Sequence, residues 1–117
     1  MSFLSAQLRQ SVLAALADRE IVKILDCALV RERSVNEVIR ECNIPHTTAY
    51  RKIKWLVEQD LLVVDRICIT DEGKKYSLFH SVFRSIVVKY ENIKIIIEAE
   101  QNIDPVENVT GKLLSLH

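Results

Sequence analysis

The sequence predicts an α+β fold in which helices fill the first half of the chain and β-strands follow. Three observations support this prediction. Apolar residues recur at helical spacing from residue 4 to about residue 58. Residues 34–62 contain the start and stop signals of two short helices joined by a three-residue turn. Runs rich in Ile and Val, separated by turn residues, then occupy residues 61–100.

The bulk composition is that of one globular domain. The chain has 117 residues, of which 49% are hydrophobic and 27% charged, so disorder is not expected. No apolar run approaches the ~18 residues of a membrane span, and the first ten residues lack the basic and apolar regions of a secretion signal. We therefore expect a cytoplasmic protein, in which three cysteines, an odd number, stay reduced rather than forming a disulfide framework.

Two helices are predicted before residue 30. The first, residues 4–17, has a broad apolar stripe made of Leu4, Leu8, Val12, Leu13, Leu16 and Ala17. Asp18 can cap the second, residues 19–29, whose inward residues are Ile21, Ile24, Leu25, Ala28 and Leu29. Both stripes are expected to form core. The first is wider than one small domain requires, which leaves a dimer contact open for it.

Residues 34–62 predict a helix-turn-helix. Ser34 and Glu37 form a capping box that starts one helix. Asn43-Ile44-Pro45 ends it, because Asn tolerates left-handed geometry and Pro begins a helix more readily than it continues one. A second helix, residues 46–58, turns Ala49, Ile53, Leu56 and Val57 inward and points Thr47, Thr48, Arg51, Lys52 and Lys54 away.

A β-hairpin over about residues 62–79 follows the second helix. Asp60 can end that helix at positive φ, and Asp71-Glu72-Gly73 forms the turn, with Lys74 and Lys75 at the tip. Such a hairpin is a wing. Residues 82–100 fit either a second hairpin around Glu91-Asn92 or a helix, and their Ile and Val content favours strands. Asp104-Pro105 predicts a short final helix.

Three stretches resemble a known family. VLAALADREIVKILDCAL, NIPHTTAYRKIKWLVEQDLL and GKKYSLF are similar to ArsR-like winged helix-turn-helix transcription regulators, especially small archaeal members. The resemblance covers about Val12 to Phe79. It implies a DNA-binding domain at residues 1–81 that includes an N-terminal dimerisation helix. Residues 82–117 would extend the same domain and add to the dimer contact.

The resemblance also implies a site. In such proteins the second helix of the motif enters the major groove of double-stranded DNA and dimers read two half-sites. The positions that match the family's base-facing and phosphate-facing residues are His46, Thr47, Thr48, Tyr50 and Arg51, with Lys52 and Lys54 behind them and Lys74 and Lys75 on the wing. Asp60 stands at the end of the second helix, where proteins of this family often have glycine. The paired cysteines of metal-sensing members are missing, so no metal site is carried over.

The charge distribution bears on this function. A net charge of zero counts against a general nucleic-acid binder. Between residues 31 and 54, however, six basic residues face three acidic ones, a surplus of three. From residue 91 onward two basic residues face five acidic ones. The local surplus lies where phosphate contact needs it.

Other functions remain open at this stage. A winged helix that docks proteins in a transcription-related assembly would suit the zero net charge, although it has no need for Arg51, Lys52 and Lys54 together. Residues 82–103 offer room for a small-molecule or redox effector. Cys42 and His46 flank the turn, but a zinc site needs two further ligands. With Gly73 and Gly111 as the only glycines and no nucleophile beside a base, neither an enzyme nor a cofactor is expected.

Overall fold

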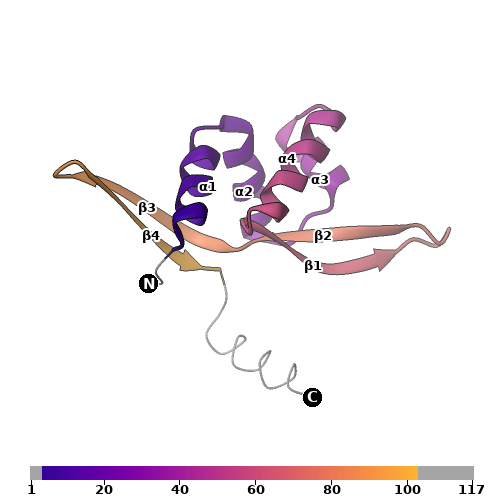
Figure 1. Cartoon of the computed structure of the whole chain (residues 1–117). Helices are drawn as coiled ribbons and strands as arrows, with labels where there is room; N and C mark the ends of the chain where they lie inside the picture. Colours follow the sequence, from indigo (N-terminus) through magenta and orange to yellow (C-terminus); the bar gives the residue numbers. More distant parts are fainter. Residues whose placement is uncertain (1–3, 103–117) are drawn as a thin grey trace, which may run out of the picture.

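A computed structural model describes residues 4–102, and Figure 1 shows their arrangement. Four helices are followed by two antiparallel hairpins. The elements are α1 (Ala6–Leu16), α2 (Arg19–Val30), α3 (Val35–Cys42), α4 (His46–Glu58), β1 (Leu62–Ile69), β2 (Lys75–Ser81), β3 (Phe83–Glu91) and β4 (Lys94–Gln101). The order confirms the α+β class and the winged helix-turn-helix fold. The predicted final helix lies outside the described residues.

Polar side chains begin three of the helices. The Ser5 hydroxyl accepts a hydrogen bond from the Leu8 amide, and the Asp18 carboxylate accepts one from the Ile21 amide. Ser34 accepts from the Glu37 amide while the Glu37 carboxylate accepts from the Ser34 amide, so the predicted capping box is confirmed. Each bond satisfies an amide that has no partner within its own helix.

The two helices of the motif each end at a residue other than glycine that has a positive φ angle. Asn43 has φ 52° and closes α3, and Asp60 has φ 61° just after α4. Both positions were expected from the tolerance of Asn and Asp for left-handed backbone. Pro45 has φ −58° and directly precedes α4. The turn between the two helices therefore consists of Asn43, Ile44 and Pro45, the three residues that the sequence predicted.

The core lies where the helices pack on the beginning of the first hairpin. Val12, Ile24, Leu56 and Leu61 keep at most 2% of their surface exposed, and Val38 keeps 1%. Other members of the core are Ala15, Ile21, Ala28, Cys42, Ile44, Ala49, Ile53, Leu62 and Ile97. The inward faces predicted for α2 and α4 are confirmed, whereas Leu16 at the end of α1 stays 40% exposed.

The first hairpin, residues 62–81, is called the wing. Its register runs from Leu62 opposite Ser81 to Ile69 opposite Lys75, with a shift between Val64 and Arg66. The wing is fastened to the helices by a backbone bridge, in which the Arg33 amide donates to the Phe79 carbonyl over 2.9 Å and the Phe79 amide donates back over 2.7 Å. The connector before α3 thus acts as a short third strand.

The second hairpin, residues 83–101, is called the arm. Its register runs from Phe83 opposite Gln101 to Glu91 opposite Lys94. The hairpin preferred for residues 82–100 is therefore confirmed, with its turn at Asn92-Ile93 instead of Glu91-Asn92, and the helical alternative is wrong. Ile97 and Ala99 are buried at the base of the arm, and the Arg9 guanidinium of α1 donates to the Ile95 carbonyl over 2.6 Å.

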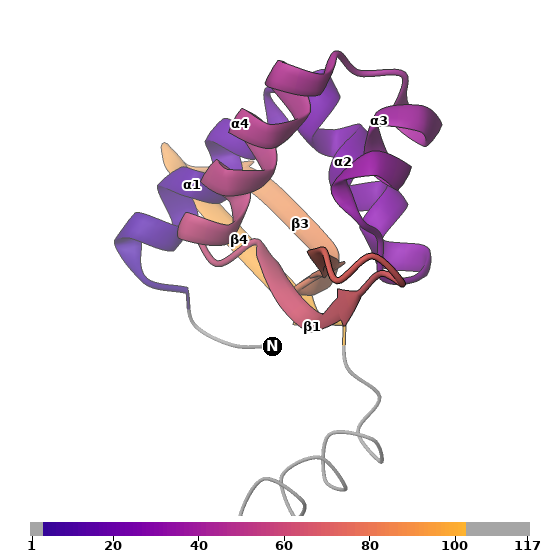
Figure 2. The ribbon, with the colours of Figure 1, turned by 90° about the vertical axis from the view of Figure 1, so that its right-hand side faces the viewer.

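The helices lie on one side of the two hairpins, which extend in opposite directions (Figures 1 and 2). Only Val82 separates β2 from β3. Its amide donates to the Leu61 carbonyl, and its carbonyl accepts from the Asn102 amide, so this junction is held from both sides. Among the described residues, no helix is both long and apolar enough to cross a membrane.

Candidate nucleic-acid interface

Helix α4 presents a polar face to solvent because its other face is fixed in the core. Ala49, Ile53 and Leu56 are buried at spacings of four and three residues, which leaves the opposite side of the helix free. No side chain caps the start of α4, since Pro45 holds that position. The first amides of the helix therefore point outward without a partner from a capping side chain.

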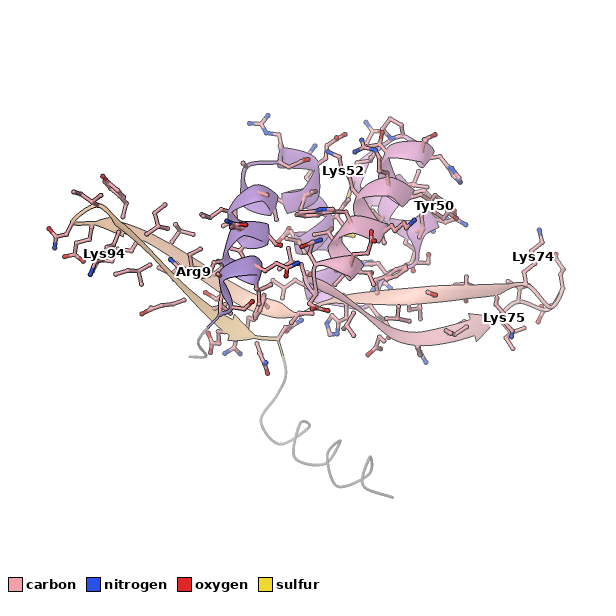
Figure 3. All side chains as sticks on the ribbon, viewed as in Figure 1. Arg9, Tyr50, Lys52, Lys74, Lys75 and Lys94 are labelled. Atoms are coloured by element: carbon pink, nitrogen blue, oxygen red, sulfur yellow. The ribbon has the colours of Figure 1, made fainter. Side chains whose placement is uncertain are left out.

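The predicted residues of α4 lie mainly on this outer face. Those classed as exposed are His46, Thr47, Tyr50, Arg51 and Lys54, and Thr48 is half-buried. Tyr50 is 50% exposed, and its ring centre lies 4.6 Å from that of His46 at an interplanar angle of 43°. The two rings therefore support each other one helical turn apart at the start of α4, and Figure 3 shows Tyr50 on the outer face of this helix.

Lys52 does not point away from the domain, and this expectation is wrong. Its ammonium lies 2.6 Å from Asp18 and 2.8 Å from Glu20, and only 11% of its side chain is exposed. The hydrogen bond from Lys52 lowers the pKa of Asp18, and the bonds to Asp18 and Glu20 raise the pKa of Lys52. Lys52 thus fastens α4 to the start of α2, a partner that no helical spacing within α4 reveals.

The wing brings Lys74 and Lys75 to the far end of the first hairpin (Figure 3). The turn is closed by the Thr70 amide donating to the Lys74 carbonyl and by the Lys74 amide donating to the Thr70 hydroxyl. Gly73 takes φ 84°, a conformation that suits glycine. Both lysines are exposed, as predicted for a wing tip.

A groove of about 910 Å³ separates the helix-turn-helix from the wing. His46 and Tyr50 line it from α4, and Lys74 and Lys75 line it from the wing. The structure therefore brings together four of the nine predicted site residues around one hollow. Thr47, Thr48, Arg51, Lys52 and Lys54 are not among its lining residues.

The groove also contains residues that the sequence did not single out. Asn36 and Arg40 reach it from α3, and Tyr76 reaches it from β2. Arg40 had counted toward the local positive charge without being assigned to the site. The backbone bridge between Arg33 and Phe79 is a tertiary contact that holds α3 opposite the wing, so a helical pattern had no signal for these three residues.

Several of the neighbouring cations are already neutralised. Arg31 pairs with Glu37 at 2.7 Å, Arg33 pairs with Glu41 at 2.8 Å, and Arg66 pairs with Glu32. The Ser34 amide and then Arg31 lower the pKa of Glu37, which is the one carboxylate among the described residues that line the groove.

Five cations on these elements have no ion pair within residues 4–102, namely Arg40, Arg51, Lys54, Lys74 and Lys75. They lie around the groove and on the outer face of α4, whereas Arg9, Arg19, Lys23 and Lys94, which also lack an ion pair among the described residues, lie on α1, α2 and the arm. This is a sharper distribution than the count of charges along the sequence, which included the paired Arg31, Arg33 and Lys52.

Cys27 and Cys42 lie apart from this surface, whereas Cys68 lies on the wing opposite Tyr76. The Cys27 thiol donates to Glu41 over 2.9 Å, and the Cys42 thiol donates to the Lys23 carbonyl over 3.6 Å. Burial raises the pKa of Cys42 and raises that of Cys27 to about 12, so both are thiols at neutral pH. Within the described part of the chain, no three His, Cys, Asp or Glu side chains gather as metal ligands.

Comparison with known proteins adds one structural likeness. No family model matches the chain, and no curated protein matches it. Among solved structures, it is similar to the crystal structure of NolR from Sinorhizobium fredii, with a TM-score of 0.45 and 16% sequence identity over 100% of this chain and 97% of that one. The winged helix-turn-helix assignment made above therefore rests on the order and packing of the chain's own elements.

Proposed function

We propose that this protein is a sequence-specific regulator of transcription that binds double-stranded DNA as a homodimer. The observation that carries the proposal is the set of five cations without an ion pair on α3, α4 and the wing, all bordering one groove or the outer face of α4. A chain of zero net charge that keeps five cations without ion pairs on this surface is suited to a polyanion there.

Helix α4 would enter the major groove. Arg51 is long enough to donate two hydrogen bonds to guanine O6 and N7, the commonest specific contact. Thr47 and Thr48 lie on the first turn, where hydroxyls and amides without helical partners suit phosphate oxygens. The stacked His46 and Tyr50 would meet base edges or the sugar-phosphate backbone, and Lys54 would add charge.

The wing would follow the neighbouring DNA backbone through Lys74 and Lys75. Arg40, on the opposite wall of the groove, would hold a phosphate between helix and wing. Such contacts position the protein without reading sequence. Lys52 leaves the set of contacts, because its ammonium is already occupied by Asp18 and Glu20.

In this proposal residues 1–81 bind DNA and α1, with the chain after residue 82, contributes to the dimer. The observation that supports this division is the apolar surface of the arm. Val87, Val88, Tyr90 and Ile93 are exposed there, along β3 and at the tip. An apolar surface of this kind fits a protein partner better than it fits DNA.

Fluorescence anisotropy with random duplex DNA, titrated over salt, tests the DNA part. Each neutralised phosphate adds about −0.9 to the slope of log K against log salt. On random duplex Arg51 has no fixed guanine to read, so we expect it to contact a phosphate as Lys54 does, and the Arg51→Ala/Lys54→Ala variant should flatten that slope by about 1.8. The matched control, Arg19→Ala/Lys23→Ala, removes two exposed cations from α2 and should leave the slope unchanged.

Two results would overturn the proposal. Negligible, salt-independent binding by the wild type would favour a winged helix that docks another protein. Equal slopes for the α4 and α2 variants would mean that DNA binds elsewhere on the molecule. Only after a positive result is a search for an operator by selection from random duplexes worthwhile.

A further inference from the structure

The tip of the arm carries a residue that its backbone does not favour. Asn92 and Ile93 form the two-residue connection between Glu91 and Lys94, with φ 52° and 66°. Turns with two positive φ angles favour Asn-Gly, and a β-branched residue at the second position is a genuine outlier. Ile93 is nevertheless 89% exposed. Within residues 4–102, the strained side chain therefore gains little from packing.

The face behind this tip is apolar as well. Val88, Tyr90 and Ile95 alternate along the paired strands with the same facing as the buried Ile97 and Ala99. α1 covers the base of that face, but the distal part keeps 42% of Val88, 74% of Tyr90 and 41% of Ile95 exposed. The arm extends beyond the helices (Figure 1), and this distal part of its apolar face is not covered by them.

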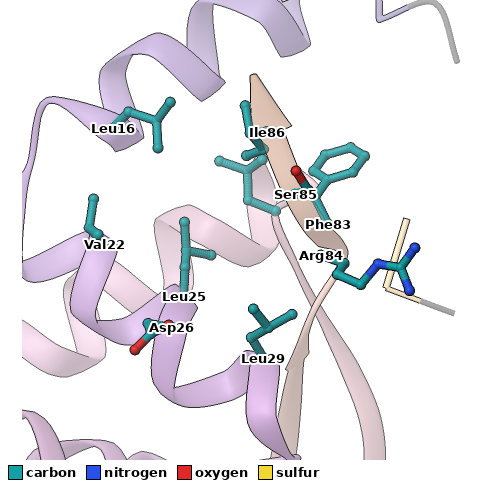
Figure 4. Close-up of a pocket in the computed structure, with 10 residues that line it drawn as sticks. Leu16, Val22, Leu25, Asp26, Leu29, Phe83, Arg84, Ser85 and Ile86 are labelled. Carbon is teal, nitrogen blue, oxygen red and sulfur yellow. The ribbon is translucent and has the colours of Figure 1, made fainter. Parts of the chain in front are cut away.

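An apolar cleft of about 190 Å³ lies at the other end of the same hairpin (Figure 4). It is bordered by the end of α1, by α2 and by the first residues of β3. Its apolar lining consists of Leu16, Val22, Leu25, Leu29, Leu61, Phe83 and Ile86. Leu16 and Val22 are each 40% exposed at its mouth, so the cleft is open to a side chain from outside.

We propose that the arm of one copy inserts Ile93 into this cleft of a second copy, and that the second arm does the same in return. Tip and cleft lie at opposite ends of β3, so two antiparallel arms place each tip at the base of the other. A two-fold interface requires this reciprocity, in which surface i meets j and j meets i. The inference deepens the homodimer part of the proposed function and rests on that part alone.

Charge supports a second copy as the occupant. Lys94 follows Ile93 at the tip, and Asp26 lies at the cleft, where the one lining cation among the described residues, Arg84, is already paired with Glu100. Neither Lys94 nor Asp26 has an ion-pair partner among the described residues 4–102, and they have opposite charge. In the reciprocal arrangement they meet twice, once at each cleft. A partner of another kind would leave one of the two surfaces, tip or cleft, unused.

Sedimentation velocity without DNA tests the inference over nanomolar to micromolar protein. Ile93→Asp is the central variant, since Asp tolerates positive φ and keeps the turn. We expect its dimer dissociation constant to rise by about a hundredfold, because each copy loses one buried aliphatic side chain. Ile67→Asp is the matched control: Ile67 is 63% exposed on the wing, and its replacement should leave the dimer unchanged.

A charge exchange makes the contact specific. Asp26→Lys and Lys94→Asp should each weaken the dimer, and the double variant should restore it because the pair is re-formed with its signs reversed. A monomeric wild type, equal effects of Ile93→Asp and Ile67→Asp, or a double variant no better than the single ones would overturn the inference. The anisotropy experiment remains a separate test of DNA binding. A monomer that binds DNA would contradict this inference alone, and a dimer that does not bind DNA would contradict the DNA part of the proposed function alone.

Discussion

The two hairpins of this protein are built from one chain but end in opposite chemistry. The wing turns through Thr70, Asp71, Glu72 and Gly73, with glycine at the position of positive φ and lysines beside it. The arm turns through Asn92 and an exposed Ile93, with its β-branched side chain at positive φ. A turn that suits its backbone needs no partner for stability. One that does not suit it is a reason to look for a contact outside the chain.

The largest expected difference concerns phosphate binding. Lys74→Gln/Lys75→Gln should reduce the salt slope of DNA binding by about 1.8, because two phosphate contacts are lost from the wing. Lys89→Gln on the arm, where the lysine pairs with Glu91 at 3.1 Å, should leave the slope unchanged. Anisotropy under identical buffer conditions measures both. A larger loss from the arm variant would reverse the roles assigned to the two hairpins.

The attachment of each hairpin to the helices gives the next effect. The Arg33 backbone bridges to Phe79 of the wing, and its side chain, 11% exposed, holds that connector by donating to the Cys27 carbonyl of α2 over 2.9 Å and pairing with Glu41 of α3. Arg33→Met should lower the free energy of unfolding by about 1–3 kcal/mol, because the part-buried Cys27 carbonyl loses its donor. Arg9→Met, which removes an exposed contact to the arm, should cost below about 0.5 kcal/mol. Urea unfolding of both variants checks the contrast, and similar losses would contradict it.

A smaller effect of opposite sign is expected at the two turns. Gly73→Ala should destabilise the protein by about 1 kcal/mol, since the position has φ 84° although no atom within 4 Å would meet the new side chain. Ile93→Gly should stabilise the single chain by up to about 1 kcal/mol by relieving strain. Thermal unfolding at protein concentrations below dimerisation measures both changes. A loss of stability from Ile93→Gly there would mean that the arm uses Ile93 within its own chain.

The smallest effect is a pH dependence at the bulge of the wing. The hydrogen bond with Glu32 raises the pKa of Asp65, so the folded state holds this proton more tightly than the unfolded state does. Ionisation of Asp65 therefore removes stability as pH rises through its folded pKa. The pKa of Glu32 is lowered, first by Asp65, and works in the opposite direction. Asp65→Asn should be slightly more stable than wild type at neutral pH, with the difference shrinking in acid, as measured by urea unfolding at pH 4 and 7.

Local rules predicted most of the fold. The capping box at Ser34, the left-handed Asn43 and Asp60, and the Ile and Val content of the arm each act over a few residues, so the sequence alone reveals them. Lys52 was misplaced because its partners, Asp18 and Glu20, lie on another helix more than thirty residues away. No periodicity within α4 contains that information.

The candidate site was predictable only on its α4 and wing sides. Arg40 and Tyr76 join the groove because the connector before α3 pairs with β2, which is a tertiary contact. The apolar cleft needed the same kind of information, since its walls come from α1, α2 and β3. The positive φ angle of Ile93 could not be predicted either, because it depends on the turn lying at Asn92-Ile93.

The single residue between β2 and β3 has a consequence for any operator. The Val82 backbone is hydrogen-bonded to Leu61 through its amide and to Asn102 through its carbonyl. The wing and the arm are therefore joined by one extended stretch of backbone. Strand residues advance by about 3.3 Å each. In the proposed dimer the number of residues between the cleft and the tip determines the distance between the α4 helices of the two copies. Deleting one cross-strand pair of residues from β3 and β4 would then change the preferred spacing between half-sites without altering any residue that contacts DNA.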